Sequence, residues 1–128
     1  MIMLKRVYEA AATSDGSRFL VERLWPRGVR KANLKIDAWL KDVGPSNDLR
    51  RWFAHDPKKW DAFRKRYFAE LDSKAKVWEG LVQAARRGPI TLIYSSRDAE
   101  HNNAVALKDY LQAKMKRAKN PARRKLAA

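Results

Sequence analysis

The chain contains no cysteine and only two histidines in 128 residues. The lack of cysteine excludes disulfides, zinc–thiolate sites, iron–sulfur clusters and thiol nucleophiles. Two histidines also argue against a multi-histidine metal site. No apolar run approaches the roughly 18 residues of a membrane span, and the N-terminal residues show no signal-peptide pattern. We therefore expect a cytoplasmic protein with no membrane span, no metal and no cofactor.

Acidic residues are also scarce: 14 Asp and Glu stand against 29 Lys and Arg, for a net charge of +15. Residues 113–128 hold seven of the basic residues and none of the acidic ones. Such an excess attracts phosphates and nucleic acids of any sequence. We predict a single domain over residues 1–112, followed by a basic C-terminal tail over 113–128. The tail either binds nucleic acid or only adds solubility.

Three segments show strand patterns. Met3–Tyr8 is apolar and β-branched around two basic residues, and Arg18–Trp25 alternates with a period of two until Pro26 ends it. Ile90–Tyr94 is a nearly continuous apolar run, typical of a strand that is covered on both faces.

Most of the chain between the second and third predicted strands has apolar residues at helical spacing. Between residues 34 and 43, apolar residues such as Ile36 and Trp39 recur at helical spacing, which predicts a helix over 34–43. Later helices are predicted at a short segment capped by Ser46, at a start marked by Asp56-Pro57, over 75–87, and after Asp98. This order predicts an α/β fold, with a small, mostly parallel sheet of about three strands packed by several helices.

A set of motifs resembles a known family. The motifs are Val21–Gly28, Ala38–Asp42, Trp52–Pro57, the aromatic series Trp60, Phe63 and Tyr67, and Gly88–Tyr94 followed by Asp98, His101 and Asn102. In order and spacing they resemble the bacterial family called domain of unknown function 488, in its YeaO-like branch, over roughly residues 4–112. The resemblance implies a small cytoplasmic α/β domain with no assigned activity. Other branches carry a Cys-His-Arg group near the third strand. This chain has serines there, so a thiol or metal role does not carry over.

The turn after the third predicted strand is the first candidate site. Ligands of open α/β sheets bind beyond the carboxyl ends of strands, and helix N-termini attract anions. Asp98 as N-cap would put His101 in the first helical turn, where the helix dipole favours a neutral imidazole. We predict Asp98 and His101 as a catalytic pair, with Tyr94, Ser95 and Asn102 binding the ligand. The alternative is an ordinary capped helix that carries a surface histidine.

The end of the second predicted strand is the second candidate site. Arg23 and Arg27 flank Trp25-Pro26, and arginine binds phosphate or carboxylate groups bidentately. We predict that Arg23, Trp25 and Arg27 bind the ligand and that Arg23 shares one cleft with His101. Alternatively, acidic residues such as Glu22 hold the arginines in internal ion pairs.

Two other features are interpreted as structural. We assign His55 to the helix start at Asp56-Pro57, although it could reach a pocket. We assign Trp60, Phe63 and Tyr67 to the core, because their spacing forms one apolar helix face. The alternative is that tryptophans and Tyr67 stack on a nucleic-acid base.

The leading hypothesis is a protein that binds a small anionic or nucleotide-like ligand at a strand-end cleft, with or without catalysis. The alternative is a nucleic-acid-binding module that uses the basic surface and tail. A scaffold without chemistry is a third possibility.

Overall fold

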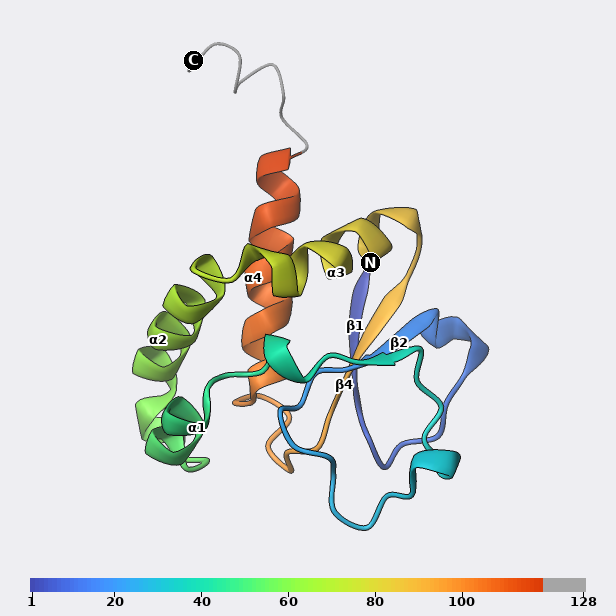
Figure 1. The fold of residues 1–128 in the computed structure, drawn as a ribbon, viewed down its shortest axis with the longest axis horizontal. Coiled ribbons are helices and arrows are strands. Elements are labelled where there is room, and N and C mark those ends of the chain that lie inside the picture. The colour runs from blue at the N-terminus through green and yellow to red at the C-terminus, as the bar shows by residue number, and fades with distance from the viewer. Residues whose placement is uncertain (119–128) are drawn as a thin grey trace.

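The fold is built on a four-stranded sheet in which every neighbouring pair is parallel, as the computed structural model describes for residues 1–118 (Figure 1). The strand order is β1-β4-β2-β3. The strands are β1 (Ile2–Arg6), β2 (Ser17–Leu20), β3 (Ala38–Trp39) and β4 (Ile90–Tyr94). The predicted α/β class and parallel sheet are confirmed, with one strand more than the three expected.

The central position of β4 explains its apolar sequence. It pairs with β1 on one side, where Leu92 lies opposite Leu4, and with β2 on the other, where Leu92 lies opposite Phe19. All five of its residues are buried. Because the strands are parallel, the carboxyl ends of β1, β4 and β2 meet at one edge of the sheet.

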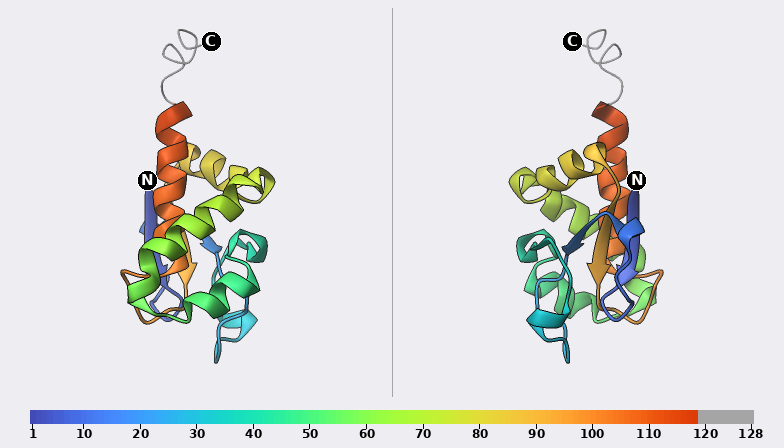
Figure 2. Two further views of the ribbon diagram at one scale, coloured as in Figure 1. Left: turned by 90° about the vertical axis from the view of Figure 1, so that its left-hand side faces the viewer. Right: turned by 90° about the vertical axis from the view of Figure 1, so that its right-hand side faces the viewer.

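The helices pack against one face of the sheet, and the loop between β2 and β3 covers the other face. They are α1 (Asn47–Phe53), α2 (Trp60–Asp72), α3 (Ala75–Arg87) and α4 (Asn103–Ala118). Their apolar residues join Leu92 and Tyr94 in the main core, and α4 contacts both β1 and β4 (Figures 1 and 2). Leu20 and Ile93 point the other way and are covered by the loop between β2 and β3, through Trp25 and neighbouring residues.

The helix predicted over residues 34–43 is wrong. This segment contains β3 and a 3-10 turn (Lys41–Val43). The Asp37 amide donates to Arg18 O, and the Leu40 amide donates to Leu20 O, so the backbone pairs with β2 instead of with itself. Trp39 packs on one side of the sheet and the next residue, Leu40, packs on the other, as successive residues of a strand do.

The second strand is shorter than predicted. β2 ends at Leu20, although the Val21 amide still donates to Ile93 O of β4. Residues 22–25 then leave the ladder as a loop. Glu22, Arg23 and Trp25 therefore do not alternate as strand residues do, and their side chains make contacts in different parts of the structure.

Predicted helix starts are confirmed at two places. Ser46 Oγ accepts the Leu49 amide at 3.2 Å and caps α1. Asp56 Oδ1 accepts the Lys58 amide at 3.0 Å, and Pro57 opens a 3-10 turn that leads into α2.

The aromatic face of α2 packs into the core as predicted. Phe63 and Tyr67 are buried. Trp60, at the start of the helix, is half-buried and packs against the same core.

Part of the predicted basic C-terminal tail lies within the last helix. Residues 113–118 are the last turns of α4, and Met115 packs against the main core. The rest of the predicted basic tail, residues 119–128, lies outside the described residues. Within residues 1–118, no helix is both long and apolar enough to cross a membrane.

Candidate functional site

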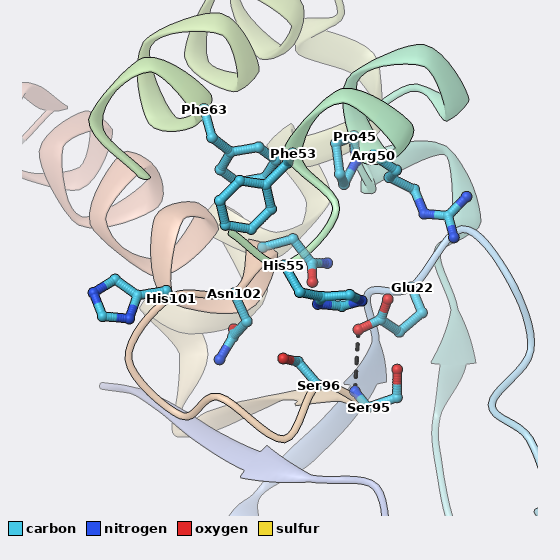
Figure 3. A pocket seen from close by; sticks show the side chains of 11 residues that line it. Glu22, Pro45, Arg50, Phe53, His55, Phe63, Ser95, Ser96, His101 and Asn102 are labelled. Atoms are coloured by element: carbon cyan, nitrogen blue, oxygen red, sulfur yellow. Dashed lines mark hydrogen bonds between the residues drawn. The ribbon is translucent and has the colours of Figure 1, made fainter. Parts of the chain in front are cut away.

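A cleft opens at the carboxyl ends of β1, β4 and β2 and has two connected parts. The inner chamber encloses about 130 Å³ and lies beneath α1 and α2 (Figure 3). Its lining residues are Glu22, Pro45, Arg50, Phe53, His55, Phe63, Ser95, Ser96, His101, Asn102 and Asn103.

The outer chamber is wider and more open to solvent. It shares five residues with the inner chamber, namely Glu22, Arg50, His55, Ser95 and Ser96. It adds residues from β1 and from the loops that follow β1, β2 and β4: Arg6, Tyr8, Leu24, Trp25, Pro26, Arg27, Arg97 and Asp98. A ligand could therefore occupy both chambers at once.

Glu22 stands where the two chambers meet. Its carboxyl Oε1 accepts the Ser95 amide at 3.1 Å, which joins the end of β2 to the end of β4 (Figure 3). Its backbone carbonyl accepts the indole N–H of Trp39 at 2.7 Å. Burial raises the pKa of Glu22 above its usual value, while the Ser95 hydrogen bond and the positive charge of Arg50 oppose that rise. A carboxyl group held in a cleft where its charge is costly is typical of a functional site.

The backbone at the end of α1 directs His55 into the cleft. Ala54 and His55 have φ values of 47° and 57°, in the left-handed region that residues with a side chain seldom adopt. The Ala54 amide still donates to Arg50 O, so α1 closes normally before the chain turns. Figure 3 shows the His55 ring beside the Glu22 carboxyl group and above Ser95. Of the two interpretations of His55, the structure favours the one in which it reaches a pocket, because His55 lines both chambers.

The loop after β4 folds around Asp98. Its Oδ1 accepts the amides of Glu100 at 2.9 Å and His101 at 3.0 Å, and its Oδ2 lies 3.0 Å from His101 Nδ1. The Glu100 amide, the His101 amide and the His101 ring lower the pKa of Asp98, and desolvation opposes them. The edge of the His101 ring also meets Trp60, with 5.4 Å between ring centroids. The predicted pairing of Asp98 with His101 is thus present, while its catalytic role stays a prediction.

The helix after this loop begins later than predicted. Asn102 Oδ1 accepts the Val105 amide at 3.0 Å, and Asn102 Nδ2 donates to Asp98 O at 2.8 Å. Asn102 therefore caps α4 in place of Asp98, and His101 precedes the helix. The dipole argument for a neutral His101 no longer applies. Asn102 is 3% exposed, so its contact with a ligand is limited to the inner chamber that it lines.

Arg23 does not line either chamber, which corrects its predicted position beside His101. Its Nε donates to Pro45 O at 2.7 Å, and its Nη2 donates to Gly44 O at 2.9 Å. A Cβ atom added to Gly44 would lie 3.1 Å from the Arg23 amide nitrogen, so the two segments are closely packed. Arg23 fastens the loop that precedes α1 to the end of β2. The hydrogen-bond acceptors of Arg23 are therefore backbone carbonyl groups, not the acidic side chains considered as its partners above.

The other predicted binding residues divide between cleft and core. Ser95, Trp25 and Arg27 line the outer chamber. Trp25 is held by a hydrogen bond from its indole N–H to Val29 O at 2.6 Å and by an edge contact with Trp39. Tyr94 is buried in the main core and does not line the cleft.

Sequence reasoning missed two arginines of the cleft. Arg6 ends β1, and its Nε donates to Ser95 O at 3.3 Å and to Ser96 O at 3.0 Å. Arg50 projects from α1, and its Nη1 donates to Asn47 Oδ1 at 3.2 Å. Arg6 could have been found, because parallel pairing places the end of β1 beside the end of β4. The position of Arg50 depends on how α1 packs, which no local pattern shows.

The residues present do not form a metal site. Within the described part of the chain, no three His, Asp or Glu side chains gather closely enough to hold a metal ion. The chemistry that the cleft offers is hydrogen bonding and charge, from arginines, one glutamate, one aspartate, two histidines, two serines and two asparagines.

Comparisons with known proteins identify the family. The family model described as "Inactive DUF488-N3 subclade" matches residues 1–127. Uncharacterized protein YeaO of Escherichia coli (strain K12) is 41% identical over 112 residues, which cover 88% of this chain and 97% of that protein. Uncharacterized protein Rv3073c of Mycobacterium tuberculosis (strain ATCC 25618 / H37Rv) is 36% identical over 113 residues, covering 88% of this chain and 95% of that protein. No solved structure gives a significant match. The chain therefore belongs to the DUF488 family, within the YeaO-like group that the sequence motifs indicated.

Proposed function

We propose that the cleft binds a small anionic ligand. The observation that carries this proposal is the convergence of four arginines on the outer chamber from four separate segments of the chain. Arg6 comes from β1, Arg27 from the loop after β2, Arg50 from α1, and Arg97 from the loop after β4.

The arginines exceed the acidic residues of the same chamber, which are Glu22 and Asp98. Asp98 is already engaged with two backbone amides and His101. Arg27 and Arg97 are exposed, so their guanidinium groups can reach a ligand. Planar guanidinium groups bind phosphate and carboxylate groups with two parallel hydrogen bonds.

The position of the cleft supports the same conclusion. Ligands of open parallel sheets bind beyond the carboxyl ends of the strands, and three strands end here. The family model's own description, an inactive subclade, gives no support to a catalytic role for Asp98 and His101.

The test compares a cleft variant with a matched surface variant. Arg27→Ala combined with Arg97→Ala removes two charges from the outer chamber. Arg86→Ala combined with Arg87→Ala removes two charges from exposed positions at the end of α3. Binding of inorganic phosphate and of nucleoside monophosphates is measured for both by isothermal titration calorimetry at fixed salt.

We expect the cleft variant to bind at least about tenfold more weakly, which corresponds to about 1.4 kcal/mol. The surface variant should bind like the parent. Equal weakening in both variants would show that total charge is responsible and would contradict the proposal. Absence of binding by the parent would contradict it as well.

A further inference from the structure

The outer chamber holds most of the large apolar side chains that the structure leaves exposed. Among residues 1–118, the exposed large hydrophobic residues are Met1, Tyr8 and Leu24. Met1 lies at the opposite end of β1 from the cleft, whereas Tyr8 and Leu24, at 52% and 57% exposed, both line the outer chamber. Exposed apolar surface that gathers beside polar groups marks a binding site. The outer chamber therefore offers apolar surface as well as positive charge.

The aromatic part of this surface is held in place by the protein. The Tyr8 hydroxyl group donates to Arg27 O at 2.9 Å, and the guanidinium carbon of Arg6 lies 4.6 Å from the centre of the Tyr8 ring. Trp25, which lines the same chamber, is held by the hydrogen bond from its indole N–H to Val29 O. A surface that is fixed before binding loses little conformational freedom when a ligand covers it.

Arg6 places positive charge directly beside this surface. Its Nε donates to the carbonyl groups of Ser95 and Ser96, which fixes the plane of the guanidinium group. Among the described residues, its terminal nitrogens Nη1 and Nη2 have no hydrogen-bond partner. A guanidinium group can present two parallel N–H groups to an oxyanion, and here that group lies against the Tyr8 ring. An anion bound by Arg6 would therefore have apolar protein surface next to it.

We propose, resting on the proposed function, that the ligand is an organic anion in which an apolar group is attached directly to the charged group. The charged group binds the outer arginines, and the apolar group covers Tyr8 and Leu24. An inorganic anion would leave both of these side chains in water. An apolar group on the anion removes them from water, which stabilises the complex in proportion to the apolar area that it covers.

The test compares phenyl phosphate with methyl phosphate by isothermal titration calorimetry at pH 8. Both esters are dianions there, because the second pKa of a phosphate monoester is about 6. We expect the parent to bind phenyl phosphate at least about tenfold more tightly. Tyr8→Ala combined with Leu24→Ala should reduce this ratio to about one, because it removes the apolar surface and leaves the arginines. Met115→Ala, which shortens a half-buried apolar side chain in the hollow at the other end of β1, is the matched control and should keep the parent's ratio.

The doubly substituted Arg27→Ala, Arg97→Ala variant separates the two proposals. It should weaken the binding of both esters by a similar factor and leave the ratio between them unchanged. Equal binding of the two esters by the parent would overturn the organic-anion proposal while the anion site stands. A ratio that the Tyr8→Ala, Leu24→Ala variant leaves unchanged, or that Met115→Ala lowers equally, would overturn it as well. If neither inorganic phosphate nor either ester binds, both proposals fail.

Two further measurements keep the test decisive. Self-association of the parent that the Tyr8→Ala, Leu24→Ala variant abolishes, measured by analytical ultracentrifugation, would assign the apolar surface to a second copy of the chain and overturn the proposal. Should that variant unfold, shown by circular dichroism, Leu24→Ala alone replaces it, because the Leu24 side chain makes no hydrogen bond. It is expected to lower the ratio between the esters, and an unchanged ratio would overturn the proposal.

Discussion

Replacing Arg23 with alanine separates a structural role from a ligand-binding role. In the structure its guanidinium group donates one hydrogen bond to Pro45 O at 2.7 Å and one to Gly44 O at 2.9 Å. A hydrogen bond that involves a charged group contributes about 1.5–3 kcal/mol. Because Arg23 is half-buried, part of each contribution is screened by solvent. We expect the variant to be less stable by about 2–4 kcal/mol in total.

The assay for this variant is thermal unfolding with and without ligand. For a domain of this size, 1 kcal/mol shifts Tm by roughly 3–5 °C, so we expect Arg23→Ala to melt about 10 °C lower than the parent. The increase in Tm that inorganic phosphate produces should remain, because Arg23 lines neither chamber. Arg23→Lys should fall between the two, since one ammonium group replaces two donors in a fixed fork. A variant with the parent's Tm and no response to ligand would refute this account and restore Arg23 as a ligand-binding residue.

Three further predictions concern the core, the amino end of the sheet and the tail. Phe63→Ala should lower the free energy of unfolding, measured in urea, by about 3–5 kcal/mol, because Phe63 is 2% exposed. A variant as stable as the parent would show that this side chain is not part of the core. The Lys5 ammonium group, followed by the Ala12 amide, lowers the pKa of Asp15 from 3.8 to about 2. The stability that this carboxylate provides is therefore complete above pH 3.8 and disappears as the pH falls toward 2. Asp15→Asn should flatten the acid-unfolding curve over that interval, and an unchanged curve would contradict the assignment. Deleting residues 119–128 should leave Tm unchanged. If these residues bind duplex DNA, the deletion should also reduce the slope of log affinity against log salt concentration by about 0.9 for each phosphate that they neutralise. An unchanged slope would show that they do not bind the phosphates.

Local sequence signals predicted the elements that local interactions define. Ser46 and Asp56 cap their helices by accepting hydrogen bonds from amides two or three residues away. The local sequence is therefore enough to predict these helix starts. The helix over Ala75–Arg87 and the strand Ile90–Tyr94 follow from spacing and apolar runs, and their predicted bounds agree with the structure.

The errors occurred where distant partners decide the conformation. β3 consists of two residues whose backbone is held by β2, and the spacing of Ile36, Trp39 and Leu40 also fits a helix. Asp98 and Asn102 are both good capping residues, and the choice between them depends on how the loop after β4 closes around the Asp98 carboxyl group.

The candidate site was predicted at the correct edge of the sheet with an incomplete set of residues. Parallel strands place the ends of β2 and β4 together, which is why Trp25, Arg27 and Ser95 lie in the cleft. His55 and Glu22 were not predicted as site residues. His55 takes its direction from the left-handed turn that follows α1, and the Glu22 carboxyl group is held by the amide of Ser95, 73 residues away, so no local sequence pattern shows either position.

The most direct test of the anion-binding cleft is a titration of the ¹⁵N-labelled protein with inorganic phosphate, followed by amide chemical shifts. We predict saturable changes that are largest at Ser95, Ser96 and Arg97, which line the outer chamber, with smaller changes near Arg27 and His55. Changes that gather instead at the end of α4 and the residues after it, or that spread over the basic surface without saturation, would contradict the account.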